Sequence, residues 1–208
     1  MKKKNQVFRM AVLAMLLAVQ LVLMFTPLGF IPIGPVRMTT MHIPVIIAGI
    51  VLGVKGGAAM GAVFGICSII IGTISPTPTS FVFSPFYSVG AFSGNFNSVI
   101  IAMVPRILIG VFAALVYQQM KKMIRNQDVA VAASAFVGSL TNTVLVMLGI
   151  YLFFGKSYAA ATNISYDVLI TAIMGIITTN GIVEAIGGVL IVMVVIRAIH
   201  PIIKKCSV

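Results

Sequence analysis

Charged side chains, and acidic ones above all, are what this sequence has least of. Of its 208 residues, 8% are charged and three are Asp or Glu, whereas 60% are hydrophobic. Soluble globular domains carry about 25% charged residues, so this composition excludes a soluble domain and indicates an integral membrane protein. Asp128 and Asp167 fall at the ends of apolar runs, so a proton relay of several acids is not expected either.

The motifs of enzymes are missing as well. The spacing of the two cysteines, Cys67 and Cys206, suits neither a metal site nor a disulfide. Residues 149–157 look like a phosphate-binding loop, but five residues rather than four separate the two glycines. We therefore expect a chain that is not an enzyme and that holds no metal or cofactor of its own.

The sequence instead contains several long apolar runs. About 20 apolar residues cross the roughly 30 Å hydrocarbon core of a bilayer. The first run is longer than the core of a signal peptide and is interpreted as a span. The sequence predicts an all-α integral membrane protein, a single membrane domain over residues 1–208 with six transmembrane helices. The predicted spans are residues 8–25, 39–53, 57–74, 99–120, 129–154 and 168–199.

Glycines and basic residues predict how these spans are connected. The glycine-rich segment 53–57 allows only a tight turn, so the second and third spans are expected to form a helical hairpin. Most of the Lys and Arg residues fall at one set of span ends, whereas Arg37 and Lys156 fall at the other. By the positive-inside rule, both termini are cytoplasmic and the connections at 26–38, 75–98 and 155–167 lie outside.

The connection at residues 75–98 is unusual. It is uncharged and rich in Phe, and three prolines interrupt it, so it is too apolar for a solvated linker and too broken for a span. We interpret it as a structured extracellular cap. Its aromatic residues, Phe83 and Tyr87 among them, either line an apolar lid or anchor the cap at the lipid interface.

Polar residues inside three spans are predicted to share one layer. Arg106 lies about 22 Å, Glu184 about 20 Å and Asn142 about 20 Å from the inner membrane edge, at 1.5 Å per residue. Asn180 precedes Glu184 by four residues and is expected on the same helix face, and Gln20 is a further candidate for the layer. Such polar groups line a binding site or form a structural Arg106–Glu184 pair.

Small residues form two stripes. Gly57, Gly61 and Gly65 recur every four positions, and either contact a partner or pack inside the bundle. Ala11, Ala14 and Ala18 lie on the otherwise apolar first span and are the better candidates for a partner interface. Two single residues are given structural interpretations: His42 as a hydrogen-bonding residue at a helix end, and Asp128 as a helix N-cap.

Several of these strings resemble a known family. PLGFIPIGPVRMTTMHIPV, SPTPTSFVFSPF, VGSLTNT and Ala14-x-x-x-Ala18 are similar to the S component, or substrate-binding subunit, of energy-coupling factor (ECF) vitamin transporters. The resemblance covers nearly the whole chain. It is to the pantothenate branch in particular, with hydroxymethylpyrimidine- and pyridoxine-type members as alternatives.

This resemblance implies a multi-pass subunit of the bacterial cell membrane that captures a vitamin from outside. The expected partners are a membrane-embedded T component, contacted through Ala14 and Ala18, and two ATPase subunits that bind ATP and Mg. Together they form an ABC importer. A self-sufficient secondary transporter is the alternative, which sparse acids and the lack of an internal repeat disfavour.

Pantothenate carries a carboxylate, two hydroxyls and an amide, which suggests roles for the polar layer. Arg106 is predicted to bind the carboxylate, with Arg37 as the second candidate, because Arg–carboxylate contacts are charge-assisted. The hydroxyls and the amide are assigned to Asn142, Asn180 and Glu184. Aromatic residues of the cap are expected to exclude water.

Overall fold

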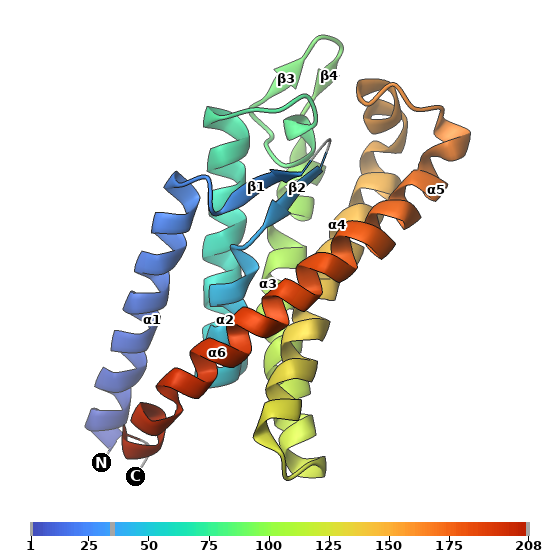
Figure 1. Ribbon diagram of the computed structural model, residues 1–208. Helices are drawn as coiled ribbons and strands as arrows, with labels where there is room; N and C mark the ends of the chain where they lie inside the picture. The colour runs from blue at the N-terminus through green and yellow to red at the C-terminus, as the bar shows by residue number, and fades with distance from the viewer. Residues whose placement is uncertain (1, 34–35, 207–208) are drawn as a thin grey trace.

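The computed structural model describes the main chain of residues 2–33 and 36–206 and the side chains of residues 6–29 and 39–201. Helices dominate it (Figure 1). They are α1 (Lys2–Phe25), α2 (His42–Ile74), α3 (Phe96–Met123), α4 (Gln127–Ala161), α5 (Tyr166–Ile176) and α6 (Ile182–Cys206). A π-helical segment, η2 (Ile177–Gly181), joins α5 to α6. Among the described residues, five helices are long and apolar enough to cross a membrane, which fits the predicted all-α membrane protein.

The helix α2 changes direction at Gly53. This glycine has φ 77° and ψ −170°, a conformation that costs a glycine little and other residues much. A methyl group on Gly49 or on Gly57 would lie 2.7 or 2.5 Å from the same atom, the carbonyl oxygen of Gly110. Eight residues of a straight helix rise about 12 Å, so the two glycines come together only because the chain reverses. The reversal was predicted, but it takes one residue rather than five.

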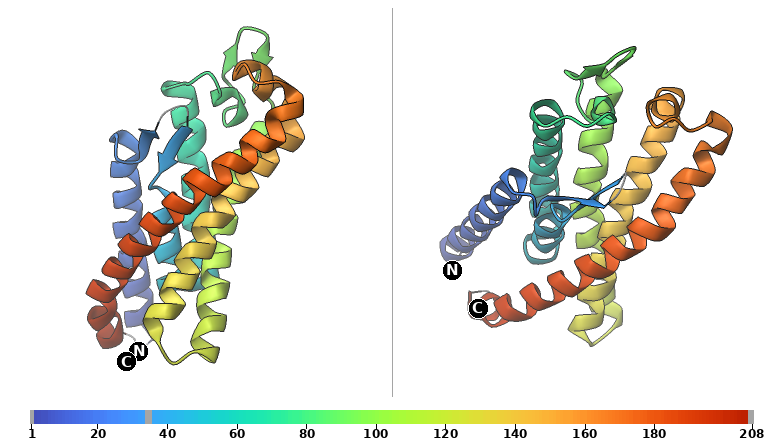
Figure 2. Two further views of the ribbon diagram at one scale, coloured as in Figure 1. Left: turned by 45° about the vertical axis from the view of Figure 1, so that its right-hand side comes forward. Right: turned by 45° about the horizontal axis from the view of Figure 1, so that its top comes forward.

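A short hairpin that the sequence analysis missed precedes α2. The strands β1 (Phe30–Ile33) and β2 (Val36–Thr39) are antiparallel and extend from α1 across the bundle (Figures 1 and 2). The predicted start of the second span at residue 39 is therefore wrong, because Thr39 is paired in β2 and the helix begins at His42. From His42 to Gly53 the helix rises only about 17 Å, so it begins part of the way down the bundle.

The glycine stripe packs inside the bundle. A methyl group on Gly61 would collide with the carbonyl oxygen of Arg106, and one on Gly65 would lie 2.9 Å from the carbonyl oxygen of Ala102. Together with the approach of Gly57 to Gly110, these contacts bring the backbones of α2 and α3 together along their length. Of the two interpretations of this stripe, the structure therefore supports internal packing.

The segment between α2 and α3 is ordered and covers one end of the bundle (Figure 1). It contains η1 (Ser80–Val82) and the two-residue strands β3 (Ser88–Val89) and β4 (Phe92–Ser93). Phe81 is fully buried, with its ring centroid 5.8 Å from that of Phe92 and 5.7 Å from that of Phe154. The hydroxyl of Ser98 donates to the carbonyl oxygen of Phe81 at 2.7 Å, which fixes the segment to the start of α3.

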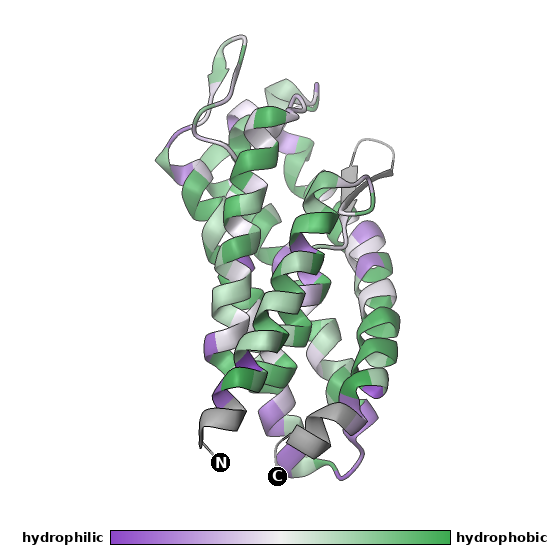
Figure 3. Cartoon of the chain, turned by 90° about the vertical axis from the view of Figure 1, so that its left-hand side faces the viewer, coloured by the Kyte–Doolittle hydropathy of each residue, from purple (hydrophilic) through white to green (hydrophobic). Residues whose placement is uncertain are grey.

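The two chain ends lie together at the opposite end of the bundle (Figure 1). Figure 3 shows hydrophilic residues near this end and a largely hydrophobic helical body. Arg9 Nη2 donates to the carbonyl oxygen of Leu52 at 2.7 Å, so the reversal at Gly53 lies at this end too. The bond satisfies a carbonyl group next to the break in α2 and fixes the register of α1 against α2.

Asp128 is not a helix N-cap, contrary to the prediction. Asn126 caps α4 instead, because its side-chain oxygen accepts from the backbone N–H of Asp128 at 3.0 Å. The Asp128 carboxylate accepts two bonds from Arg197 of α6, from Nη2 at 2.6 Å and from Nε at 3.2 Å. A pair of residues 69 positions apart cannot be found from local sequence patterns.

The α2–α3 contact leads to a stability prediction. We expect Gly61→Ala to cost about 1–3 kcal/mol, because the new methyl group meets a backbone oxygen that cannot move away. Thermal unfolding of the purified protein in detergent measures the effect. Gly187→Ala is the matched control, since nothing lies within 4 Å of its methyl position. Equal melting temperatures for the two variants would contradict the proposed packing.

Candidate functional site

Six side chains form what we call the buried polar cluster. They come from α1, α2, α3, α4 and α6, and each has a buried nitrogen or oxygen atom that makes no hydrogen bond among the described residues. The members are Gln20, His42, Arg106, Ser139, Asn142 and Glu184. A buried polar atom without a partner costs about 1–3 kcal/mol, so such atoms are rare in native proteins. A polar ligand among these helices would supply the missing partners.

Three members of the cluster meet where α6 crosses the bundle. Glu184 Oε1 lies 3.3 Å from His42 Nδ1, although neither atom makes a hydrogen bond to any described residue. Gly188, one turn further along α6, allows the close approach, since a methyl group there would lie 2.9 Å from Ser139 Oγ and 3.0 Å from His42 Nε2. The side chains of His42, Ser139 and Glu184 therefore share one small region of the interior.

Arg106 is held in place by its neighbours. Pro105 has no N–H group, so within α3 the carbonyl oxygen of Ile101 has lost its usual helical donor. Arg106 Nη1 donates to that oxygen at 2.6 Å. The guanidinium carbon lies 5.1 Å from the ring centroid of Phe83 and 5.5 Å from that of Phe64. These contacts fix the guanidinium group while its Nε remains without a partner.

Asn142 and Gln20 extend the cluster. Asn142 follows Ser139 by one turn of α4, and its side-chain oxygen has no partner. The Arg9–Leu52 bond sets the depth of Gln20: from that bond, α1 rises about 16 Å to Gln20 and α2 about 15 Å to His42. Gln20 is fully buried and lies at the depth of His42, with both polar atoms of its amide group unpartnered.

The three main members of the predicted layer, Arg106, Asn142 and Glu184, are all buried. The structural pair that was the alternative is not seen, because no Arg106 nitrogen comes within 4.0 Å of a Glu184 oxygen in the described structure.

Asn180 does not join the cluster. It is partly exposed, and its side-chain oxygen accepts from Thr179 Oγ1 at 3.3 Å. The prediction assumed α-helical spacing, whereas η2 widens the turn and directs Gly181 inward instead, against Thr143. The predicted role of Arg37 concerns a side chain outside the described residues, although its main chain lies in β2.

The two predicted cap aromatics occupy different places. Phe83 turns inward onto Arg106, so the segment 75–98 directly covers part of the buried polar cluster. Tyr87 is partly buried and packs with the apolar group around Phe81. Phe86 is 79% exposed and points away. The lid interpretation therefore fits Phe83, and the anchor interpretation fits Phe86.

The alanine stripe of α1 faces outward. Ala11, Ala14 and Ala18 are exposed, whereas Leu16 and Gln20 face the bundle. One side of α1 thus faces the bundle and the other is exposed.

Sequence reasoning missed His42 and Ser139 as members of the cluster. His42 was predicted to hydrogen-bond at a helix end, and it does begin α2, but within the described part of the chain neither ring nitrogen makes a hydrogen bond. The spacing of Ser139, Asn142 and Thr143 along one helix face was the available signal.

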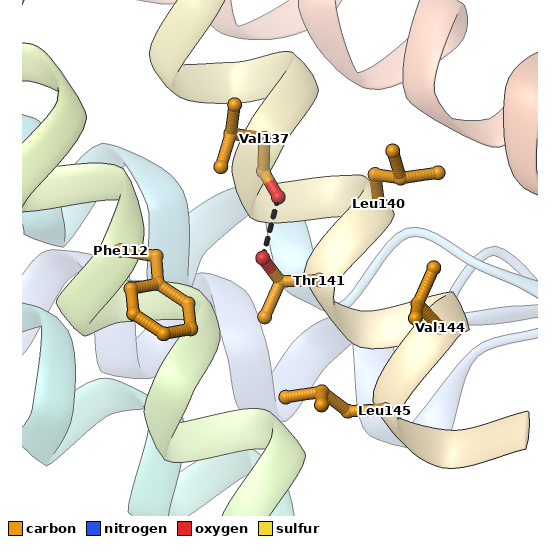
Figure 4. Close-up of a pocket in the computed structure, with 6 residues that line it drawn as sticks. All are labelled: Phe112, Val137, Leu140, Thr141, Val144 and Leu145. Atoms are coloured by element: carbon orange, nitrogen blue, oxygen red, sulfur yellow. Dashed lines mark hydrogen bonds between the residues drawn. The ribbon is translucent and has the colours of Figure 1, made fainter. Parts of the chain in front are cut away.

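The grooves on the outside of the bundle are apolar. One of about 250 Å³ lies between α3 and α4 and is lined by Phe112, Val137, Leu140, Thr141, Val144 and Leu145 (Figure 4). Its hydroxyl, that of Thr141, already donates to the Val137 carbonyl oxygen at 2.7 Å. Because this hydroxyl is already hydrogen-bonded, the buried polar cluster is the better candidate for a site that binds a polar ligand.

Comparisons with known proteins find a matching family and similar chains. A family model described as "ECF transporter, substrate-specific component" matches residues 8–196. The chain is 38% identical over 193 residues to the pantothenic acid transporter PanT of Lactococcus lactis subsp. cremoris, covering 88% of this chain and 96% of that protein. It is 27% identical over 190 residues to the pantothenate transporter PanT of Leuconostoc mesenteroides subsp. mesenteroides, covering 87% and 86%.

The Arg106–Ile101 contact can be tested by a double-mutant cycle. Pro105→Ala supplies a backbone donor to Ile101, so it should stabilise the protein more in an Arg106→Ala background than in the unmodified protein. We expect a coupling of about 1 kcal/mol, the worth of one hydrogen bond, from unfolding in detergent. Strictly additive effects would show that Arg106 does not satisfy this carbonyl group.

Proposed function

The chain belongs to the family of substrate-specific components of ECF transporters, and from this premise we propose that it captures pantothenate outside the cell for an ECF-type ABC importer. As a member of a transporter family with several apolar helices, it is a multi-pass protein of the cell membrane and not itself an enzyme. The pantothenate assignment is supported by the names of its two relatives and by the chemistry of the buried polar cluster.

The observation that carries the proposal is the fixed guanidinium group of Arg106. The guanidinium group is held by Phe64, Phe83 and the Ile101 carbonyl oxygen. Its buried Nε–H group makes no hydrogen bond among the described residues, so it can donate to a ligand. A carboxylate bound there forms charge-assisted hydrogen bonds, about twice as strong as neutral ones. Arg106 therefore binds the pantothenate carboxylate. Arg37 is the second candidate for this role.

The remaining members of the cluster bind the neutral part of the ligand. Asn142 and Glu184 offer unpartnered oxygens to hydroxyl or amide N–H groups. Phe83, with Tyr87 behind it, excludes water from the charged end. Asn180 is not part of the proposed site, since it lies outside the buried polar cluster.

The proposed membrane topology has six crossings with both termini in the cytoplasm. The reversal at Gly53 divides α2 into two passes, and the common end of α1 and α6 fits an even number of crossings. Basic residues near that end, such as Lys55 and Lys121, support its cytoplasmic placement. The segment 75–98 then faces outward, above the site.

The proposed partners are a T component and two ATPase subunits, which would bind ATP and Mg and hydrolyse the ATP. The exposed stripe of Ala11, Ala14 and Ala18 supplies the T-component contact, because small residues let helices approach closely in lipid. It lies on the opposite side of α1 from Gln20.

The first prediction concerns binding. The purified protein should bind pantothenate, and Arg106→Ala should weaken binding at least about 30-fold, since removing one partner of a buried charge pair costs about 2–5 kcal/mol. Isothermal titration calorimetry measures both affinities.

Arg125→Ala is the control for this experiment, because Arg125 is exposed at the opposite end of the bundle and should leave the affinity unchanged. Pyridoxine and hydroxymethylpyrimidine are titrated in parallel. Tighter binding of either, or undiminished pantothenate affinity in Arg106→Ala, would refute the assignment.

A second prediction concerns assembly. Replacing Ala14 and Ala18 together with Leu should abolish co-purification with the T component and the ATPases, because added volume separates the packed helices. Pantothenate affinity should not change. Ala160→Leu, an exposed alanine at the other end of the bundle, is the matched control. An intact complex with the double variant would place the interface elsewhere.

A further inference from the structure

The buried polar cluster has two chemically different ends. At one end, Arg106 is committed to Ile101 and to two aromatic rings, and it presents a donor. At the other end, Glu184 and His42 face each other across 3.3 Å, and the two facing atoms make no hydrogen bond with the side chains and main chain that the structure describes. Since Arg106 and Glu184 form no direct ion pair in the described structure, neither charge neutralises the other by contact, and both remain available to a ligand.

The His42–Glu184 end is rich in acceptors. Among the described residues, Glu184 Oε1, Asn142 Oδ1 and Gln20 Oε1 lack donors, Gln20 Nε2 lacks an acceptor, and Ser139 Oγ and the His42 ring can both donate and accept. An anionic group is poorly matched to these atoms, whereas hydroxyl groups donate to them and accept in return. Pantothenate has the same polarity along its length, with a carboxylate at one end and two hydroxyls at the other.

We propose that His42 and Glu184 recognise the hydroxyl end of the ligand and thereby set both its orientation and the specificity for hydroxylated acids. This inference rests on the proposed function, because it takes Arg106 as the carboxylate end. Glu184 accepts from the hydroxyls, and His42, which lies close to Gly188, completes the same contact. His42 at the start of α2 is thus a specificity residue as well.

The proposed role of His42 and Glu184 is tested by measuring the affinities of two ligands for the unmodified protein and for several variants. The ligands are pantothenate and its analogue without hydroxyls, N-(3,3-dimethylbutanoyl)-β-alanine. The unmodified protein should bind the analogue at least about 100-fold more weakly, because a site built for hydroxyls leaves its polar groups unpaired without them. In Glu184→Leu the preference for pantothenate over the analogue should fall below about fivefold, because this variant binds pantothenate more weakly.

Two further variants keep the test informative if Glu184→Leu does not fold. Glu184→Gln and His42→Gln preserve the side-chain volume more closely, and each should reduce the preference about tenfold, as expected for a weakened hydrogen bond. Arg106→Ala is the matched variant from the other end. It should weaken the binding of both ligands equally, so the ratio of the two affinities should not change.

The outcomes separate the two proposals. If the unmodified protein does not bind pantothenate, the proposed function and this inference both fail. If it binds pantothenate but the foldable Glu184 and His42 variants weaken both ligands equally, only the hydroxyl-recognition role is overturned, and the pair is structural. The hydroxyl-recognition role is also overturned if the unmodified protein binds pantothenate and its analogue equally well.

Discussion

A guanidinium group inside an apolar bundle must be held by hydrogen bonds and by the faces of neighbouring groups, and the arrangement around Arg106 meets this requirement. Pro105 frees the carbonyl oxygen that Arg106 binds, Phe64 places α2 against it, and Phe83 brings the outer segment down onto it. One side chain thus connects α3, α2 and the segment 75–98. The rest of the buried polar cluster is arranged around this fixed charge.

The sequence predicted the parts of the fold that depend on regular periodicity. Apolar length located the helices, and the rise per residue placed Arg106, Asn142 and Glu184 at similar depth. The sequence-based prediction failed where the backbone departs from α-helical geometry. The π-helical segment η2 moves Asn180 away from the helix face that carries Glu184. Gly-Pro at residues 34–35, a frequent turn signal, could have indicated the hairpin β1–β2.

Contacts between distant segments could not be predicted in this way. His42 joins the cluster because α6 crosses the bundle at Gly188, and Asp128 pairs with an arginine 69 residues away. Neither crossing angle nor register is encoded in a local pattern. Of the six side chains of the buried polar cluster, the sequence therefore indicated Arg106, Gln20, Asn142 and Glu184 but not His42 or Ser139.

The glycine contacts between α2 and α3 also bear on how the interior becomes accessible. Backbones that touch at Gly57, Gly61 and Gly110 leave no slack for sliding, so we expect these two helices to move as one rigid body. If the interior opens, the opening must therefore come from a displacement of the other elements relative to this body.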